Sequence, residues 1–557
     1  MKTRNLALAI SLILATTLFS QYAAQDSIAL AMMKKDVTYL AHDRLQGREA
    51  GTKGEEMAAQ YIANRMETVG LTPNGDPNSY YQKFNFKESP VVEHSALTLD
   101  GATLKYEEAF YPISGSGNGS LEAEVIYLDF GIHAPDLGLD NYKKKKVAGK
   151  IAIVELGDPE GAHPHSKYIK VNDVSSKIAA AEDAGAIGLV FLNSKEQVDD
   201  PDERLTKYTK ASSIPVVFLK GKYADLGFGK GSKMKMEVTI TQEERTAMNV
   251  IGYMDNEAEF TVVVGAHFDH LGFGIEGTLH RGEDGAIHNG ADDNASGVAA
   301  MIQIADDLKK HGPKSNNYMF IAFSGEEKGL LGSNYFMKNP TGEPGAFNYM
   351  LNMDMVGRMD STEHALAINA VGTSPAWAVL DSIEVDSIRI KTTESGVGPS
   401  DHTSFYLKDI PVLHFFSGTH ADYHKPSDDE HLINYAGMLS IVRYMEEVIT
   451  RMDKREKLEF TKTKDQDNES APRFTVTLGV VPDYLYDGEG MKIDGITDGK
   501  PASVAGLEVG DVVVKLGDHD VKDMMGYMKA LGMFKKGDAT TVEVIRKKEV
   551  VKADIQF

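Results

Sequence analysis

The most constraining feature of this 557-residue sequence is a series of apolar, strand-like segments between residues 245 and 452. Amphipathic helical segments separate them, such as GVAAMIQIADDLKK at residues 297–310. Strands that are apolar on both faces and alternate with helices are typical of a largely parallel sheet covered by helices. We therefore expect an α/β domain with a mostly parallel central sheet flanked by helices.

Five places along this region, each at a strand end or next to a helix start, carry an imidazole or a carboxylate. In chain order these residues are His267 with Asp269, Asp292 with Asp293, Glu326 with Glu327, Asp354, and His420 with His424. In open α/β sheets, functional residues gather at the carboxyl ends of the strands. So many acids need positive charge from elsewhere, and nitrogen and oxygen ligands without thiolates suit zinc or a similar divalent ion. The sequence contains no cysteine, so any metal site must use histidines and carboxylates.

Two metal ions explain the number of candidate ligands better than one. A catalytic zinc takes about three protein ligands plus water, and two ions about 3.5–4 Å apart can share one bridging carboxylate. Two histidines and three carboxylates are enough for such a pair. This leaves one acid over from the adjacent residues Glu326 and Glu327. We expect one of these glutamates to hold a metal and its neighbour to take a proton from the activated water.

Five motifs in a fixed order resemble the co-catalytic zinc aminopeptidases. They are HFD, GADDNASG, SGEEKGLLGS, NMDMVG and DYHKPSD. The same family includes the glutamate carboxypeptidase and transferrin-receptor type proteins. The resemblance covers residues 27 to about 450 and implies a zinc-exopeptidase fold that binds two Zn²⁺ ions.

Matched motif by motif, the resemblance implies two ligand sets that share one acid. One zinc would be held by His267, Asp354 and the bridging Asp293, and the other by Glu327, His424 and the same Asp293. Asp293 is preferred to its neighbour because the family's bridging acid lies three residues before the serine of the SG pair. The family also places a cis peptide bond just after this acid.

The resemblance further implies roles for residues around the metals. Glu326 would be the general base, and Asp269 would hydrogen-bond the far nitrogen of His267 and fix its tautomer. Tyr423 would place its phenol against the oxyanion, the alternative being a packing role. The segment with Asp401 and His402 would line the substrate pocket without touching a metal. The remaining histidines of these loops are expected to be supporting residues: His270, His280, His288 and His420.

The activity implied is hydrolysis of the N-terminal residue from peptides with a free N-terminus. The acidic surroundings suit a cationic α-amine and disfavour an anionic C-terminus. Two alternatives remain open. One is a carboxypeptidase or dipeptidase on the same scaffold, and the other is a non-catalytic, receptor-like binding protein. The complete ligand set together with Glu326 weighs against the receptor.

The rest of the chain divides into further blocks. Residues 113–242 resemble a protease-associated insert, either a cap that restricts substrate length or a structural insertion, so that the peptidase domain would comprise 27–112 and 243–452. Residues 453–473 are charged and are expected to form a linker. Residues 474–557 resemble a PDZ domain, which would bind the C-terminus of a peptide or protein at the loop Thr477–Val480, or simply mediate packing or assembly.

The N-terminus predicts export. A short basic region precedes a 14-residue apolar stretch at 6–19, which is too short to span a bilayer comfortably. We therefore expect a signal peptide at 1–24 and a secreted or periplasmic protein with no membrane association after cleavage. The net charge of -23 argues against nucleic acid as a partner.

Overall fold

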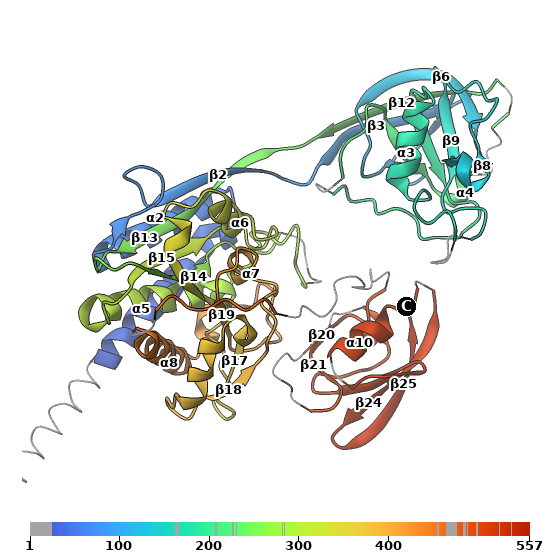
Figure 1. Cartoon of the computed structure of the whole chain (residues 1–557). Coiled ribbons are helices and arrows are strands. Elements are labelled where there is room, and N and C mark those ends of the chain that lie inside the picture. Colours follow the sequence, from blue (N-terminus) through green and yellow to red (C-terminus); the bar gives the residue numbers. More distant parts are fainter. Residues whose placement is uncertain are drawn as a thin grey trace, which may run out of the picture. The chain divides into compact units, whose positions relative to one another are not determined.

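The computed structural model describes most of the chain after residue 24 (Figure 1). The described residues are 25–161, 166–206, 209–224, 228–229, 231–280, 282, 285–453, 456–463, 476–482, 486, 488–496, 499–522, 524–535 and 537–557. The predicted signal peptide, 1–24, lies outside them. The chain separates into two compact units: residues 86–245 form one, called here the insert, and the remaining residues form the other. Of the described helices, none is both long and apolar enough to cross a bilayer.

A nine-stranded sheet forms the centre of the larger unit. Its middle strands run parallel, with Val264 paired to Phe320 on one side and to Leu351 on the other. Antiparallel strands flank this parallel region. The mostly parallel sheet predicted from the sequence is therefore confirmed. The strand order is β1 (Thr72–Pro73), β13 (Glu244–Met254), β15 (Asn317–Phe323), β14 (Thr261–His267), β16 (Phe347–Met353), β19 (Val412–Phe416), β17 (Ala365–Asn369) and β18 (Arg389–Thr392), with β2 (Tyr81–Lys87) on β13.

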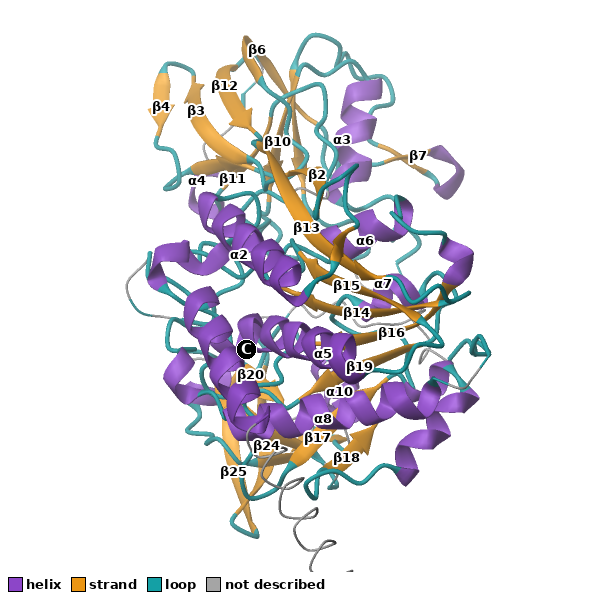
Figure 2. Cartoon of the chain, turned by 90° about the vertical axis from the view of Figure 1, so that its left-hand side faces the viewer, coloured by secondary structure: helices purple, strands orange, loops and turns teal. Residues whose placement is uncertain are grey.

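Helices cover both faces of this sheet. Because successive strand residues point to opposite sides, neighbouring residues of one strand pack into different cores. Val262 and Val264 pack into the core under α2, α5 and α8, which lie over one face of the sheet in Figure 2. Val263 packs into a second core with Phe336 of α6 and Phe405 of α7. The described α-helices of this unit before residue 453 are a segment over 25–40, α2 (Lys53–Val69), α5 (Gly297–His311), α6 (Leu331–Lys338), α7 (His402–Tyr406) and α8 (Tyr435–Met452). Helix α2 is capped by Gly70, which has a left-handed conformation with φ of 85°.

The insert contains an eight-stranded sheet with helices α3 (Val174–Asp183) and α4 (Gly221–Ala224). Its start differs from the predicted one. Residues 86–112 were assigned to the peptidase domain, but β3 pairs with β12 and β5 pairs with β11, so this segment belongs to the insert. The strand order is β4 (Ala102–Leu104), β3 (Val91–Leu99), β12 (Lys233–Thr241), β6 (Gly119–Tyr127), β9 (Ile151–Glu155), β10 (Gly188–Leu192), β11 (Val216–Leu219) and β5 (Phe110–Pro112), and a separate pair is formed by β7 (His133–Ala134) and β8 (Leu139–Asp140).

The predicted linker is ordered in its described first part. Residues 456–463 follow the surface of the peptidase domain: Leu458 N donates to Asn348 Oδ1 at 2.8 Å, and Thr463 Oγ1 lies 2.9 Å from the Tyr406 hydroxyl. The described first part of the expected linker therefore packs against the peptidase domain. Residues 464–473 lie outside the described residues.

The C-terminal block folds around its own small core. In the loop predicted to bind a carboxylate, Gly479 N donates to Thr477 Oγ1 at 3.0 Å, and Leu478 is buried. The elements are β20 (Val480–Pro482), β21 (Met491–Ile496), α9 (Pro501–Val504), β22 (Val512–Leu516), β23 (His519–Asp520), α10 (Met524–Leu531), β24 (Ala539–Arg546) and β25 (Glu549–Gln556).

Candidate metal centre

Neighbouring strands bring the predicted site residues to one edge of the central sheet. The parallel strands β14, β15, β16 and β19 all have their carboxyl ends there, and α5 begins nearby after the turn η3 (Ala291–Ser296). The residues delivered are His267 at the end of β14, Glu326 and Glu327 after β15, Asp354 after β16, Asp293 within η3, and His424 in the loop after β19.

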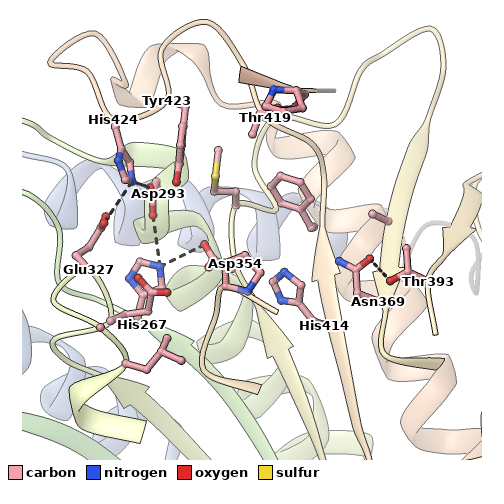
Figure 3. A pocket seen from close by; sticks show the side chains of 18 of the residues that line it. His267, Asp293, Glu327, Asp354, Asn369, Thr393, His414, Thr419, Tyr423 and His424 are labelled. Atoms are coloured by element: carbon pink, nitrogen blue, oxygen red, sulfur yellow. Dashed lines mark hydrogen bonds and ion pairs between the residues drawn. The ribbon is translucent and has the colours of Figure 1, made fainter. Parts of the chain in front are cut away.

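Asp293 lies between the two histidines predicted as ligands (Figure 3). Its Oδ1 is 3.4 Å from His267 Nε2, and its Oδ2 is 3.2 Å from His424 Nε2. His267 Nε2 is also 3.2 Å from Asp354 Oδ1. Each oxygen of one buried carboxylate thus faces a different histidine, which is the arrangement required of an acid that bridges two ions.

Glu327 is faced by two histidines rather than one. His424 Nε2 lies 3.3 Å from Glu327 Oε2, and His270 Nδ1 lies 2.7 Å from Glu327 Oε1. His270 Nδ1 is also 3.9 Å from Asp293 Oδ2. His270 was expected only to support the loops, yet its position allows it either to orient Glu327 by donating a hydrogen bond or to join the ligand set.

Main-chain carbonyls fix both ligand imidazoles. His267 Nδ1 lies 3.2 Å from the Asp269 main-chain oxygen, whereas the Asp269 carboxylate is 3.8 Å away. The predicted partner residue is therefore present, but the contact is made by its carbonyl and not by its side chain. The Asp269 carboxylate instead accepts a hydrogen bond from Glu326 N at 3.1 Å. His424 Nδ1 lies 2.9 Å from the Gly277 oxygen. With Nδ1 donating to a carbonyl, each histidine presents Nε2 to a metal.

The pKa values of the two adjacent glutamates are shifted in opposite directions. Burial, reinforced by the negative charges of Asp354 and Glu327, raises the pKa of Glu326 well above its ordinary value, and His267 opposes this. Burial acts in the same direction on Glu327, but His424 and His270 outweigh it and lower its pKa to about 2. Glu326 is thus the glutamate that retains affinity for a proton, as a general base requires, and Glu327 remains an anion.

Asp292 faces away from the two histidines. Its Oδ1 accepts a hydrogen bond from Gly357 N at 2.6 Å, and its Oδ2 lies 3.2 Å from His420 Nε2. The peptide bond after Asp293 is cis, as the resemblance implies. These contacts favour Asp293 over Asp292 as the metal-binding acid and give His420 a supporting place.

A pocket opens beside the candidate ligands. Its lining includes both glutamates and the apolar side chains of Leu330, Met355 and Phe416. Tyr423 also lines it, and its ring stacks on His424 with centroids 3.9 Å apart. Further lining residues visible in Figure 3 are Asn369, Thr393, His414 and Thr419. The pocket wall beyond the acids is therefore mostly uncharged.

The segment expected to line this pocket lies partly beneath it. Pro399 is in the lining, but Asp401 and His402 are fully buried. His402 stacks on His414 with ring centroids 4.5 Å apart, and His414 reaches the pocket. Asp401 and His402 therefore support the wall and do not form it.

One buried residue near the ligands was missed by sequence reasoning. Arg48 is 1% exposed, and its guanidinium contacts the main chain directly after His267 and shortly before Asp293. The only signal in the sequence is the glycine-rich stretch LQGREAG at 45–51, in which Gly47 has φ of 70°. A side chain on Gly47 would meet the Gly272 and His288 carbonyl oxygens at 2.5 and 2.6 Å.

Comparison with known proteins assigns families to three parts of the chain. The pattern described as "Peptidase family M28" matches residues 249–449, "PA domain" matches 121–226, and "PDZ domain" matches 450–557. Aminopeptidase YwaD of Bacillus subtilis (strain 168) is 27% identical over 403 residues, which are 69% of this chain and 77% of the relative.

Two solved structures were also matched to the chain. An aminopeptidase from Aneurinibacillus sp. strain AM-1 has a TM-score of 0.49 and 20% identity, and covers 78% of this chain and 95% of its own. BSAP, a zinc aminopeptidase from Bacillus subtilis, has a TM-score of 0.44 and 23% identity, and covers 78% of this chain and 98% of its own.

Proposed function

We propose that this chain is an aminopeptidase that uses two zinc ions, and the match of residues 249–449 to peptidase family M28 supports this proposal. The observation that carries the proposal is the position of Asp293, whose two oxygens face His267 and His424 from opposite sides. The related B. subtilis protein, itself named an aminopeptidase, supports the activity.

The donor set fits zinc. It consists of imidazole nitrogens that lie 3.2–3.4 Å from carboxylate oxygens, and zinc prefers such ligands. In our proposal His267, Asp354 and Asp293 hold one ion, and Glu327, His424 and Asp293 hold the other. When bound, the zinc ions would acidify a water molecule between them and polarise the scissile carbonyl.

The chain's own residues would move the proton. Glu326 lies in the pocket wall next to these ligands and has a raised pKa, so it can take a proton from the attacking water. It would then donate this proton to the leaving amine as the peptide bond breaks. Tyr423, which lines the same pocket, would donate a hydrogen bond to the oxyanion.

The residues around the pocket favour an N-terminal over a C-terminal exopeptidase. Of the acids that line it, Asp293, Glu327 and Asp354 would be neutralised by the zinc ions, and Glu326 is not a proposed ligand. Among the described lining residues there is no lysine or arginine that could pair with the terminal carboxylate of a peptide. The apolar wall suits a neutral side chain at the substrate's N-terminus.

A substrate panel and a zinc analysis test the proposal. The purified protein should release arylamine from aminoacyl-arylamides with free amines, lose this activity with a chelator and regain it with zinc. The same substrates with an acetylated amine should not be cleaved. Equal cleavage of blocked and free substrates would favour the carboxypeptidase or dipeptidase alternative, and failure to cleave either would favour the binding protein.

The number of zinc ions is tested by two variants. Mass spectrometry of the wild-type chain should count two zinc ions. Asp293→Ala should lose both, because Asp293 faces both histidines, whereas Asp354→Ala should keep about one, because Asp354 faces only His267. Equal zinc content in the two variants would contradict the bridge.

Two further proposals concern the rest of the chain. The N-terminal apolar segment supports export to the periplasm or the exterior, which a mass measurement of the mature N-terminus would test. The match of residues 450–557 to a PDZ domain supports recognition of a peptide or protein C-terminus by the C-terminal block.

A further inference from the structure

Arg48 is a fully buried cation whose hydrogen bonds all go to main-chain carbonyls. Nε donates to the Phe268 oxygen at 2.7 Å, Nη1 to the Asn289 oxygen at 2.6 Å, and Nη2 to the Gly290 oxygen at 3.0 Å. Nη1 also donates to the Leu40 oxygen. A guanidinium has five N–H groups in a rigid, planar fork. Four of them are therefore used to join three separate stretches of the chain.

Two of these stretches carry candidate metal ligands. Phe268 directly follows His267, and Gly290 lies three residues before Asp293. The contacts span 220 and 242 positions of sequence, so the fork fixes the distance between the segment that follows β14 and the segment that precedes η3. Main-chain hydrogen bonds of Arg48 and Gly47 add to this, since Arg48 O accepts from His270 N at 3.3 Å and Gly47 O from Gly272 N at 3.1 Å.

The positive charge of Arg48 lies near the carboxylates of the candidate metal site. Burial lowers its pKa to about 10, while the acids around the site, Asp293, Asp269, Asp428 and Glu327, act in the opposite direction. Arg48 therefore stays charged at neutral pH. A permanent cation behind the ligands reduces the mutual repulsion of the carboxylates.

We propose that Arg48 is a positioning residue that holds the His267 and Asp293 segments in the geometry for zinc before zinc binds. The proposal rests on the metal site put forward above. It goes beyond that site because Arg48 touches neither ligand side chain nor substrate: it acts through the main chain. Loss of groups that support metal ligands typically costs about 10–100-fold in metal affinity.

Arg48→Lys tests the proposal, because lysine keeps the charge but cannot make the fork. Zinc affinity of the full chain is measured by competition with a chromophoric chelator, and the unfolding midpoint is measured with and without zinc. We expect zinc affinity to fall about 10–100-fold and the rise in midpoint caused by zinc to shrink.

Arg65→Lys is the matched control. Arg65 is a second buried arginine of the same unit, and its fork binds the Asp36 carboxylate at 2.7 and 3.1 Å. This variant should lower the unfolding midpoint of the zinc-free chain but leave zinc affinity within about twofold of wild type, since the hydrogen bonds of Arg65 described here go to Asp36 and not to a segment that carries a candidate ligand. If Arg48→Lys behaves in the same way, Arg48 is only a structural residue and the proposal is wrong.

Hydrogen exchange of the wild-type chain keeps the proposal testable if Arg48→Lys does not fold. Amides of residues 286–296 should stay protected in the zinc-free protein, and removing zinc should speed their exchange no more than that of the amides of β14. Rapid exchange there without zinc would show that zinc, and not Arg48, orders the segment. A wild-type chain that takes up no zinc would instead contradict the proposed metal site itself.

Discussion

The metal centre and a polar cluster in the insert both bury several charged groups, yet they satisfy them differently. In the insert, Lys177 is fully buried and donates to the Glu155 and Gly157 main-chain oxygens at 2.8 and 2.6 Å. The Glu155 carboxylate accepts hydrogen bonds from Ser194 N and Oγ and from the Tyr127 hydroxyl.

At the candidate metal centre, hydrogen bonds within the protein do not satisfy every buried polar group. Two histidines face each of Asp293 and Glu327. Within the described part of the chain, Asp269 Oδ2 and His270 Nε2 are buried without a hydrogen-bond partner. Buried polar groups are normally paired, and exceptions point to a missing ion or a catalytic role. The comparison shows that a buried polar cluster alone does not identify a metal site. A cluster is a better candidate when several possible ligands face one another and some of their neighbouring buried polar atoms have no hydrogen-bond partner.

The largest expected effect is on turnover, and it should distinguish Glu326 from a buried acid without a catalytic role. Glu326→Gln should bind as much zinc as the wild-type chain and lose about 10²–10⁴-fold in turnover, because the variant cannot accept the proton of water. Glu327→Gln should lose zinc at one site. The control is Glu155→Gln in the insert, which should lower stability but leave turnover on an arylamide unchanged. A similar loss of turnover in Glu155→Gln would show that the polar cluster of the insert also matters for catalysis, contrary to the difference drawn here between the two regions.

Metal removal should affect the two regions differently. At free zinc a thousandfold above Kd, one bound ion stabilises the folded state by about 4 kcal/mol. Chelation should therefore speed hydrogen exchange in β14 and β15 and leave β9 and β10 unchanged. Equal acceleration in all four strands would show that the insert depends on the metal as well.

The smallest expected effect is a pH dependence in the insert. Burial lowers the pKa of Lys177 to about 8, and Asp158 and Glu155 only partly oppose this. Between about pH 8 and pH 10.5 the unfolded chain binds more protons at this lysine than the folded chain, so this lysine's contribution to stability rises with pH in that window.

Lys177→Met should remove this rise. The variant should also be less stable by about 1–3 kcal/mol near neutral pH, because two buried carbonyl oxygens lose their donor. Urea unfolding of the insert strands at pH 7.5 and pH 10, followed by hydrogen exchange, measures both effects. An unchanged pH slope in the variant would mean that Lys177 keeps its ordinary pKa.

Much of the site could be predicted because its residues stand where the strand pattern ends. His267 closes β14, and Glu326 and Glu327 follow β15, so a parallel sheet necessarily brings them together. Arg48 could not be predicted, because its partners are carbonyl groups, which every residue has. The contact of Asp269 differs from expectation for the same reason: its carbonyl, not its side chain, faces His267.

The start of the insert was misplaced because its first strands lack a clear apolar pattern. In β3 only Leu97 and Leu99 are buried, and the rest of the strand is partly or fully exposed. The alternation that marks a half-buried strand is therefore absent from its first half. Its place in the fold depends on pairing with β12, more than a hundred residues later in the chain.

The insert is connected to the central sheet through two paired strands, β2 and β13. The chain leaves the central sheet along β2 and returns along β13, and Glu88 N donates to the Glu243 oxygen at 2.9 Å where the insert begins and ends. The two ends therefore meet as the base of a hairpin, whatever the size of what lies between them. Because the entropy cost of closing a loop grows only with the logarithm of its length, a module gained or lost at this point leaves the register of the catalytic sheet intact.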